Sequence, residues 1–505
     1  VQLSANNQTI LNNITLSSGQ INLSGLSGGG NGLLTIAGNV SGNGGFTIGV
    51  GAYTDFTGTS SYAGLTSIGG GNSVTRFSGR YTSSGGITIG NGWGYLNSDF
   101  NGGLPGGLLK LGTGASGEPL IGALNALRSA TNNVLMGSYG SGKRVQVVGS
   151  QSLSLTGTWT VGEGTNTSRT INNNISGTGN SLTLGPVVLG QDVDTAARTL
   201  TIQGSGNTTF SGVIANSPAA GNYRGNLTID TASAVVRLQA NNTYSGTTTL
   251  TANTVFLEAV NSIPGGIGAT GGSGPLIISA GVLNLAASDF LRPLGTGDGQ
   301  VSMGSAVVGF AANGADRVVN LGGLSAPVTW GSGNFTTNNE MVLGNAYATH
   351  MVDFQNPLNL NGSTRSIYVG NGSGTVDARI SGSITGGSTI GLTISGGGML
   401  SLTGTNTFGG KVTVRDGGVE VSWLPAGGSN SPLGTNGTVD LGSNATAGTF
   451  RWVGGDCTLL RTLNLSGTSG GATIDASGAG ALTISGNPTV AAGAKAFTLS
   501  GTSTA

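Results

Sequence analysis

The sequence predicts an all-β fold, a right-handed parallel β-helix (β-solenoid) that extends over residues 1–505 as one continuous domain. Three observations support this prediction. Glycine accounts for 98 of the 505 residues, short apolar-polar-apolar triplets recur along the chain, and Gly, Asn and Ser fill the gaps between them. Each triplet has the period of a strand with one buried face. The residues in the gaps are those that turns require.

The triplets recur from one end of the chain to the other. Strands this short cannot bury an apolar face alone, so we expect them to wind into coils of about 20–25 residues that stack at ~4.8 Å. Leu, Ile and Val then fill the interior, and Thr points outward, where a β-branched residue suits a strand. The clearest triplets lie at 34–36, 46–48, 87–89, 182–184, 200–202, 227–229, 392–394, 463–465, 482–484 and 497–499.

The composition argues against several other classes of protein. Apolar residues make up 36% of the chain, which is more than disordered Gly/Ser-rich segments carry. The formal net charge is zero and no basic cluster is longer than Lys143-Arg144, so we expect no nucleic-acid partner. No apolar run reaches the ~18 residues that a membrane-spanning helix needs. Cys457 is the only cysteine, so no disulfide can form within the chain.

An array of antiparallel β-sandwiches is the competing all-β fold. Hairpins would place Asn-Gly or Asp-Gly pairs between longer alternating strands. Asn-Gly pairs do begin at residues 91, 101, 361 and 371, but they are not regularly spaced between such strands. The pattern therefore favours the solenoid.

One interruption of the repeat is expected at residues 91–145, as an irregular insertion with a short helix at 118–129. Pro119 stands where a first-turn proline would. Leu120 and Leu127 are among several apolar residues at helical spacing in this segment. We expect the helix to cap the coil wall or to lie against it.

A second interruption is expected at residues 258–275. Pro264 and Pro275 bracket a glycine-rich stretch that contains no apolar alternation. Proline and glycine in this arrangement are typical of turns and loops. The sequence therefore predicts a protruding loop.

One longer block occurs twice, at residues 238–250 and 402–414. We expect the matched Asn residues to occupy the same turn of two different coils, where their amides can hydrogen-bond to neighbouring coils. The matched pairs are Asn242 and Asn406, Tyr244 and Phe408, and Gly246 and Gly410.

The sequence Asn-Thr-Tyr-Ser-Gly-Thr-Thr-Thr-Leu at 242–250, with the Leu-Thr-Ile triplet before it, resembles the autotransporter-associated β-strand repeat. Residues 406–414 are similar to a second copy. The resemblance implies a parallel β-helix of the passenger type, secreted by a type V-like bacterial route and often adhesive or structural. It implies nothing about catalytic residues.

Candidate catalytic residues are few. A polysaccharide-cleaving β-helix needs carboxylates close together, often with Arg or Lys. The nearest candidates in the sequence are Asp289, Arg292 and Asp298, and Asp192 with Asp194. We interpret these as solvated charges on loops, and we expect no catalytic residue.

Metal and cofactor sites are not expected either. The only histidine, His350, has no carboxylate or Cys beside it in the sequence, so we interpret it as structural. Asp456 and Asp475 are interpreted as loop residues, because Asp is too rare here for a calcium-binding repeat. The glycine-rich strings lack the Gly-Lys-Ser/Thr sequence of a phosphate-binding loop.

Aromatic residues are the best candidates for binding. Trp93, Tyr95 and Trp423 lie in glycine- or proline-flanked contexts, where a flat ring could stack on a sugar or a partner protein. Trp330 is a further candidate, although Trp330 and Trp452 also lie in strand-like contexts that suit the core. Asn-x-Ser/Thr sequons are numerous, and we attribute them to the abundance of these residues. They include Asn13, Asn22, Asn39, Asn174, Asn226 and Asn464.

These observations favour an extracellular structural or adhesive rod over an enzyme. We expect it to be secreted and to act outside a bacterial cell or at the cell surface, associated with the outer membrane. The alternative is a β-helix enzyme that binds or cleaves polysaccharides. Because both ends of the chain carry the repeat pattern, an open last coil needs a cover. The expected partners are another copy joined end to end in a filament, further coils of a longer precursor, and cell-surface or glycan partners.

Overall fold

The computed structural model describes residues 6–25, 32–96, 107–114, 117–139, 144–163, 168–191, 194–219, 221, 223–269, 272–425 and 429–502. These residues form a parallel β-solenoid of about 17 turns, and no helix occurs among them. The chain divides into two compact units, unit 1 (Val1–Asn253) and unit 2 (Thr254–Ala505). The predicted all-β solenoid is confirmed, while the handedness of its coil stays a prediction.

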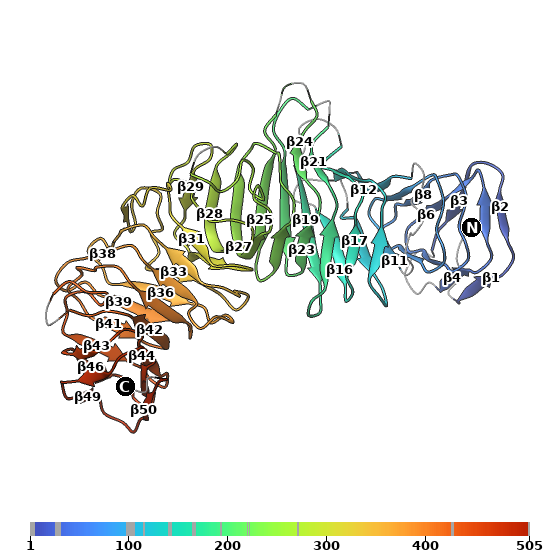
Figure 1. Ribbon diagram of the computed structural model, residues 1–505. Coiled ribbons are helices and arrows are strands. Elements are labelled where there is room, and N and C mark those ends of the chain that lie inside the picture. The colour runs from blue at the N-terminus through green and yellow to red at the C-terminus, as the bar shows by residue number, and fades with distance from the viewer. Residues whose placement is uncertain are drawn as a thin grey trace. The chain divides into compact units, whose positions relative to one another are not determined.

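Unit 1 is built on a long parallel ladder, in which each strand pairs with the strand one coil further along the chain. Figure 1 shows these strands side by side in chain order, from blue to green. The strands of this main ladder are β1 (Gln8–Ile10), β4 (Leu33–Ile36), β7 (Tyr53–Phe56), β9 (Val74–Phe77), β11 (Trp93–Leu96), β13 (Leu120–Ala123), β16 (Val145–Gly149), β19 (Arg169–Ile175), β22 (Thr199–Gly204), β25 (Asn226–Thr231) and β27 (Thr248–Leu257).

Two further rows of parallel strands close the coils of unit 1. One row consists of β14 (Arg128–Ala130), β17 (Leu153–Leu155), β20 (Ser181–Leu184), β23 (Asn207–Phe210) and β26 (Val235–Leu238). The other is a nine-stranded sheet of β3 (Gln20–Leu23), β6 (Gly45–Ile48), β8 (Thr66–Ile68), β10 (Ile87–Ile89), β12 (Leu109–Gly114), β15 (Val134–Tyr139), β18 (Trp159–Thr160), β21 (Val187–Leu189) and β24 (Ile214–Asn216). The short strands β2 (Ile14–Leu16) and β5 (Val40–Gly42) pair separately.

Unit 2 repeats this arrangement with its own ladder. The ladder strands are β28 (Leu276–Leu285), β29 (Val301–Met303), β30 (Val308–Ala312), β33 (Glu340–Leu343), β36 (Arg365–Val369), β39 (Leu392–Ser395), β41 (Val412–Val414), β43 (Thr438–Leu441), β46 (Thr462–Leu465) and β49 (Thr489–Val490). An eight-stranded sheet follows β31 (Arg317–Val319), β34 (Val352–Phe354), β37 (Ala378–Ile380), β40 (Met399–Leu402), β42 (Gly417–Val421), β44 (Gly448–Trp452), β47 (Ala472–Ala476) and β50 (Phe497–Ser500). Smaller sheets join β32 (Val328–Thr329), β35 (Leu358–Asn359) and β38 (Ile384–Thr385), and β45 (Cys457–Leu459) with β48 (Leu482–Ile484).

The length of a coil varies more than the sequence predicts. Val74 pairs with Trp93, 19 residues later, whereas Val308 pairs with Met341, 33 residues later. The inward apolar residues fix the register, since a slip of one residue would turn every side chain to the other face. The connections are free to differ in length, because they lie outside the strands.

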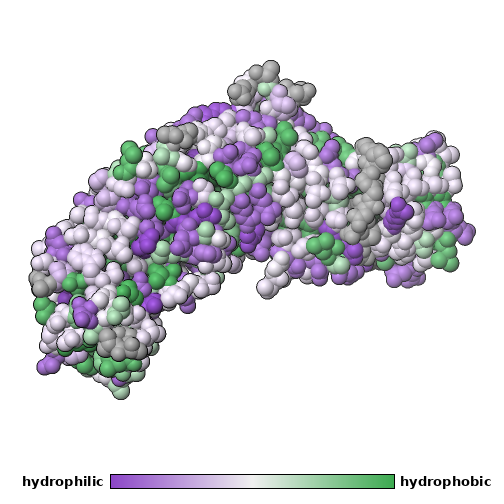
Figure 2. Space-filling model, in the orientation of Figure 1, coloured by the Kyte–Doolittle hydropathy of each residue, from purple (hydrophilic) through white to green (hydrophobic). Residues whose placement is uncertain are grey.

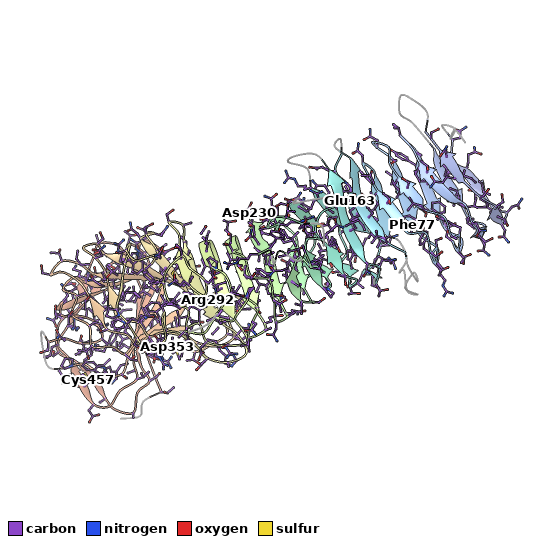
Figure 3. All side chains as sticks on the ribbon, turned by 90° about the horizontal axis from the view of Figure 1, so that it is seen from above. Phe77, Glu163, Asp230, Arg292, Asp353 and Cys457 are labelled. Atoms are coloured by element: carbon purple, nitrogen blue, oxygen red, sulfur yellow. The ribbon has the colours of Figure 1, made fainter. Side chains whose placement is uncertain are left out.

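The interior of the N-terminal coils of unit 1 holds a column of aromatic rings. Phe56 and Phe77, in register on β7 and β9, stack with ring centroids 5.8 Å apart, and Phe77 is labelled in Figure 3. Tyr62 and Tyr81 lie against each other at 5.9 Å, and both hydroxyls hydrogen-bond to Thr66. Burial raises the pKa of both tyrosines. The aromatic column therefore continues the stacking of the coils inside the core.

Asparagine side chains join successive coils at their turns. Asn242 accepts a hydrogen bond from the backbone N–H of Ile214 (2.8 Å), and Asn406 accepts one from Ile384 (2.6 Å). The two residues of the repeated block thus play the same part in units 1 and 2. The expected coil-to-coil role of these amides is confirmed.

The other matched positions of the repeated block also have defined structural roles. Tyr244 and Phe408 are fully buried. A Cβ atom on Gly410 would come within 2.4 Å of the carbonyl carbon of Ile390, so the backbone of the previous coil leaves no room for a side chain there. The repeated block therefore places a ring in the core, an amide at a turn, and a glycine where the backbones of two coils approach closely.

The expected helix at 118–129 is wrong. These residues form β13 and the start of β14, separated by Asn125 with a left-handed φ of 65°. Strands of the previous and the next coil supply the backbone partners of β13 on both sides. This tertiary pairing overrides the helical spacing of the side chains. The described part of 91–145 continues the ladders through β11 to β16.

The segment 258–275, expected to protrude, forms no strand among its described residues, and part of it packs inward. Ile263 and Ile267 are buried. The buried Arg292 guanidinium donates hydrogen bonds to three backbone carbonyls of the segment. They are those of Pro264 (2.7 Å), Gly266 (2.8 Å) and Gly274 (3.0 Å). One arginine therefore holds this segment of unit 2 in place through its backbone carbonyls.

Candidate functional site

Two of the three charged residues of the first catalytic candidate group, Asp289 and Arg292, hydrogen-bond to the backbone of the chain itself. Asp289 accepts a hydrogen bond from the backbone N–H of Val318 (2.9 Å), and Arg292 is committed to the loop carbonyls. Asp298 lies on an exposed turn. The interpretation of Arg292 as a solvated charge is wrong, because its side chain is fully buried.

The second group of catalytic candidates consists of Asp192 and Asp194. Asp192 lies outside the described residues. Asp194 is buried, pairs with Arg198, and accepts a hydrogen bond from the backbone N–H of Gln191 (2.8 Å). Its carboxylate therefore closes a local turn, and the interpretation of Asp194 as a solvated charge is wrong.

No candidate metal centre is found in the part of the chain that the structure describes, since no three His, Cys, Asp or Glu side chains gather there. His350 lies 2.9 Å from the hydroxyl of Thr349 through its Nδ1 atom. The half-buried Cys457 has a pKa raised by burial, which disfavours the reactive thiolate.

The tryptophans separate into core and surface residues. Trp330 and Trp452 are buried, and their ring N–H groups donate to the backbone carbonyls of Asn338 and Gly455. Trp423 is half-buried. Trp93 is 43% exposed on the outer face of β11, and it is therefore the tryptophan best placed to meet a partner.

Trp93 belongs to a row of apolar side chains on the outer face of the main ladder of unit 1. Tyr53, Val74, Trp93 and Leu120 lie in register on four successive coils. The Tyr95 ring lies beside Trp93, with centroids 6.4 Å apart, and packs over the backbone of the next coil. Burial raises the pKa of Tyr95 against the opposing effect of Arg76, so its phenol stays neutral.

The same row continues as polar side chains. Gln146, Asn172, Gln203 and Asp230 follow Leu120 in register, one on each of the next four coils. Tyr53, Val74, Trp93 and Leu120, followed by these four residues, form what we call the outer column. The first four residues are its aromatic half and the last four its polar half.

Side-chain hydrogen bonds run along the polar half. Asn172 donates to Gln146 (2.7 Å), and Gln203 donates to Asp230 (2.8 Å). Asp230, labelled in Figure 3, also accepts from the hydroxyl of Thr251 (2.6 Å). Each bond joins one coil to the next, so these side chains hold one another in place.

Two charged residues beside the outer column complete this network. Gln146 donates to Glu118 (2.6 Å), and Arg144 donates to Gln203 (3.1 Å). The Nε atom of Arg144 lies 3.7 Å from the carboxylate of Glu118. A continuous chain of polar contacts therefore runs from Asn172 through Arg144 to Asp230, with one positive and two negative charges.

A row of threonines lies next to the polar half. Thr170, Thr201, Thr228 and Thr249 are in register on successive coils, and all four are half-buried. Their hydroxyls widen the polar half without adding charge. The face that Figure 2 shows has small hydrophobic patches among pale and hydrophilic residues.

The outer face of the eight-stranded sheet in unit 2 has a different character. Arg379 pairs with Asp353 (2.9 Å), and Arg451 lies between Glu420 (3.3 Å) and Asp475 (3.4 Å). These charges alternate in sign, with two arginines paired to three carboxylates. The interpretation of Asp475 as a loop residue is wrong, since it lies within β47.

The sequon side chains take part in contacts between coils. The amide nitrogen of Asn464 donates to Asp440 (2.8 Å), and that of Asn226 donates to Thr199 (3.4 Å). Asn13 and Asn39 each accept a backbone N–H from the following coil. These contacts give the sequon asparagines a structural role of their own.

The sequence singled out Trp93, and Tyr95 beside it, but missed the other seven residues of the outer column. Its members are separated by unequal intervals, from the 19 residues between Val74 and Trp93 to the 31 between Asn172 and Gln203. No fixed period in the sequence connects them. The alternation of outward residues within each strand was the available signal, but it does not tell which strands are neighbours.

Comparison with known proteins gives no match for this chain, whether with family models, curated proteins or solved structures. In the part of the chain that the structure describes, no helix is long and apolar enough to span a membrane.

Proposed function

We propose that this chain is an extracellular structural and adhesive β-solenoid, of the passenger type found in type V-like secreted bacterial proteins. The observation that carries the proposal is the outer column, which displays aromatic and amide side chains in register over eight coils of unit 1. The resemblance of 242–250 and 406–414 to the autotransporter-associated repeat supports secretion to a bacterial cell surface.

The construction of the coils suits a load-carrying or adhesive role. Every ladder strand has parallel partners, and turn amides such as that of Asn406 add bonds between coils. Residues on such a ladder keep their positions without a ligand, which lowers the entropy lost on binding. A surface of this kind is ready to bind without rearrangement.

The alternative of a polysaccharide-cleaving enzyme has less support. Such a mechanism needs an acid and a base or nucleophile facing one substrate. Asp289 and Asp194 instead accept hydrogen bonds from the backbone, and Arg292 is buried within a loop. We therefore prefer the adhesive function.

Adhesion is tested with beads coated with the full chain. The beads are passed under flow over surfaces coated with neutral polysaccharide, with serum protein and with a bare apolar film. We expect retention on at least one surface at bead densities where albumin-coated beads wash off. Asp298→Ala and His350→Ala should leave retention unchanged. If the beads adhere to none of the three surfaces, the proposed function is contradicted.

End-to-end association is a second candidate function, favoured by the last coils of unit 2. Three apolar side chains are exposed there: Val490, Phe497 and Leu499. Among the described residues, their strands pair only with a strand of the preceding coil. In unit 1, Ile10 and Leu11 of the first coil are exposed as well. Backbone groups and apolar side chains on such open coils can be covered by another copy or by further coils.

Sedimentation and electron microscopy of the full chain test this association. We expect concentration-dependent filaments that Leu499→Asp abolishes, because a charge would enter the junction. Leu324→Asp, at a highly exposed site elsewhere in unit 2, is the matched control. A monomer at all concentrations would contradict the filament, and a longer parent in mass spectra of native material would favour further coils.

A further inference from the structure

We propose that the outer column binds a neutral polysaccharide chain, laid along the direction in which the coils stack. The inference rests on the proposed adhesive function and names its partner. It combines three properties of the outer column: exposed rings, fixed amides with unused hydrogen-bonding capacity, and little net charge.

The aromatic half supplies stacking surfaces. Trp93 and Tyr53 are both more than one-third exposed, and they lie two coils apart, which corresponds to ~9.6 Å. Val74 and Leu120 fill the positions beside them in the row. The C–H face of a sugar ring is apolar. Stacking this face on an aromatic ring removes apolar surface of both partners from water, which favours binding. Tyr95, against the edge of Trp93, limits the freedom of that ring.

The polar half supplies donors and acceptors together. A primary amide has two N–H groups and an oxygen with two lone pairs. The amide of Gln146 donates once to Glu118 and accepts once from Asn172, so a second N–H and a second lone pair remain. The Gln203 amide, which donates to Asp230 and accepts from Arg144, has the same capacity. Hydroxyl groups, which both donate and accept, match such pairs.

The charges favour a neutral partner. Glu118 and Asp230 are negative and Arg144 is positive, so the network carries a net charge of about −1. Arg144 is paired with Glu118, and Asp230 accepts hydrogen bonds from Gln203 and Thr251. At the polar half an anionic polymer would meet this net negative charge, and Arg144 is already paired with Glu118. A cationic polymer would find carboxylates that already accept hydrogen bonds from Gln146 and Thr251.

A protein partner fits the outer column less well. Protein interfaces concentrate apolar residues at their centre. Here the aromatic residues occupy one half of the row, and amides and a carboxylate occupy the other. A linear polymer of repeating rings and hydroxyls can use both halves, because it presents both chemistries along its whole length.

The direction of the row predicts a dependence on chain length. From Tyr53 to Asp230 the outer column takes seven coil steps, which corresponds to ~34 Å. Monosaccharides and disaccharides should bind weakly. Affinity should rise with oligosaccharide length and reach a plateau when the chain spans the outer column.

The test is affinity electrophoresis of the full chain in native gels that contain hydroxyethylcellulose, dextran, galactomannan or alginate. We expect at least one neutral polymer to retard the protein and alginate to leave its mobility unchanged. Trp93→Ala should weaken the apparent affinity about tenfold, and Gln203→Ala a few-fold. Tyr368→Ala, which removes an exposed aromatic from the ladder of unit 2, is the matched control and should change nothing.

Because Trp93→Ala could also loosen β11, the melting temperature of each variant is measured alongside. Tyr53→Thr, which removes the other exposed ring of the aromatic half and places a β-branched residue on the strand, gives a second readout and should weaken retardation with little change in that temperature. Equal loss in Tyr368→Ala, binding to alginate alone, or retardation by none of the neutral polymers would overturn the inference. Beads that adhere to serum protein while no polymer retards the chain would overturn it too, yet leave the proposed adhesive function standing.

Discussion

The Oδ1 atom of Asn406 accepts a hydrogen bond from the backbone N–H of Ile384, 22 residues earlier in the chain, at 2.6 Å. The Nδ2 atom of the same side chain donates to the carbonyl of Pro432 (2.6 Å), 26 residues later. One buried amide thus joins three successive coils at a turn, beside the isolated backbone bridge between Asn406 and Ser431.

Replacing Asn406 by Ala is expected to destabilise unit 2 by about 2–4 kcal/mol, since it leaves a buried N–H and a buried carbonyl without partners. Asn430→Ala, at an exposed neighbouring turn position, should change stability by less than ~0.5 kcal/mol. Denaturant unfolding followed by hydrogen exchange of unit 2 measures both. Equal stabilities would show that the turn amide contributes nothing.

The repeated block shows why much of the fold could be predicted from the sequence. Within a dozen residues the block contains a turn amide (Asn242 or Asn406) and a buried ring (Tyr244 or Phe408). Such a local pattern can be recognised in the sequence even when the coils differ in length. The neighbours of Leu120 could not be predicted, because its apolar spacing fits a helix as well as a strand. Only pairing with Trp93 and Gln146 decides between them.

The buried guanidinium of Arg292 predicts a local defect when it is removed. Arg292→Met keeps much of the side-chain volume but leaves the carbonyls of Pro264, Gly266 and Gly274 without their donor. We expect hydrogen exchange and proteolysis in 258–275 to speed up at least tenfold. Arg415→Met, at an exposed arginine of unit 2, is the control. Unchanged protection of the segment would contradict the role assigned to Arg292.

The buried tyrosine pair predicts a loss of stability in alkali. Burial raises the folded-state pKa of Tyr62 and Tyr81 above the ordinary value of 10.0. The native state therefore keeps these protons where the unfolded chain has released them. The resulting stabilisation is full below pH ~10 and is lost as the pH rises through the raised pKa. Urea unfolding of unit 1 at pH 8 and pH 11 should show the decrease.

The variant with both Tyr62→Phe and Tyr81→Phe is the control for that decrease. It has no ionisable group at either position, so its stability should fall less between pH 8 and pH 11. The near-ultraviolet absorbance of tyrosinate, followed in the same titration, reports when the buried hydroxyls ionise. An identical alkaline loss in the parent chain and the variant would show that the pair is not responsible.

Distances across the main ladder of unit 1 test most directly the claim that the outer face is assembled by parallel stacking of coils. Spin labels are placed at Asn174 and, in turn, at Arg76, Asp55 or Thr35, which share one outward row on β19, β9, β7 and β4. With Cys457 changed to Ser, pulsed electron paramagnetic resonance should give separations of ~19, ~24 and ~29 Å for four, five and six coil steps. Separations that do not increase by about one coil spacing at each step would contradict the stacked ladder and, with it, the outer column.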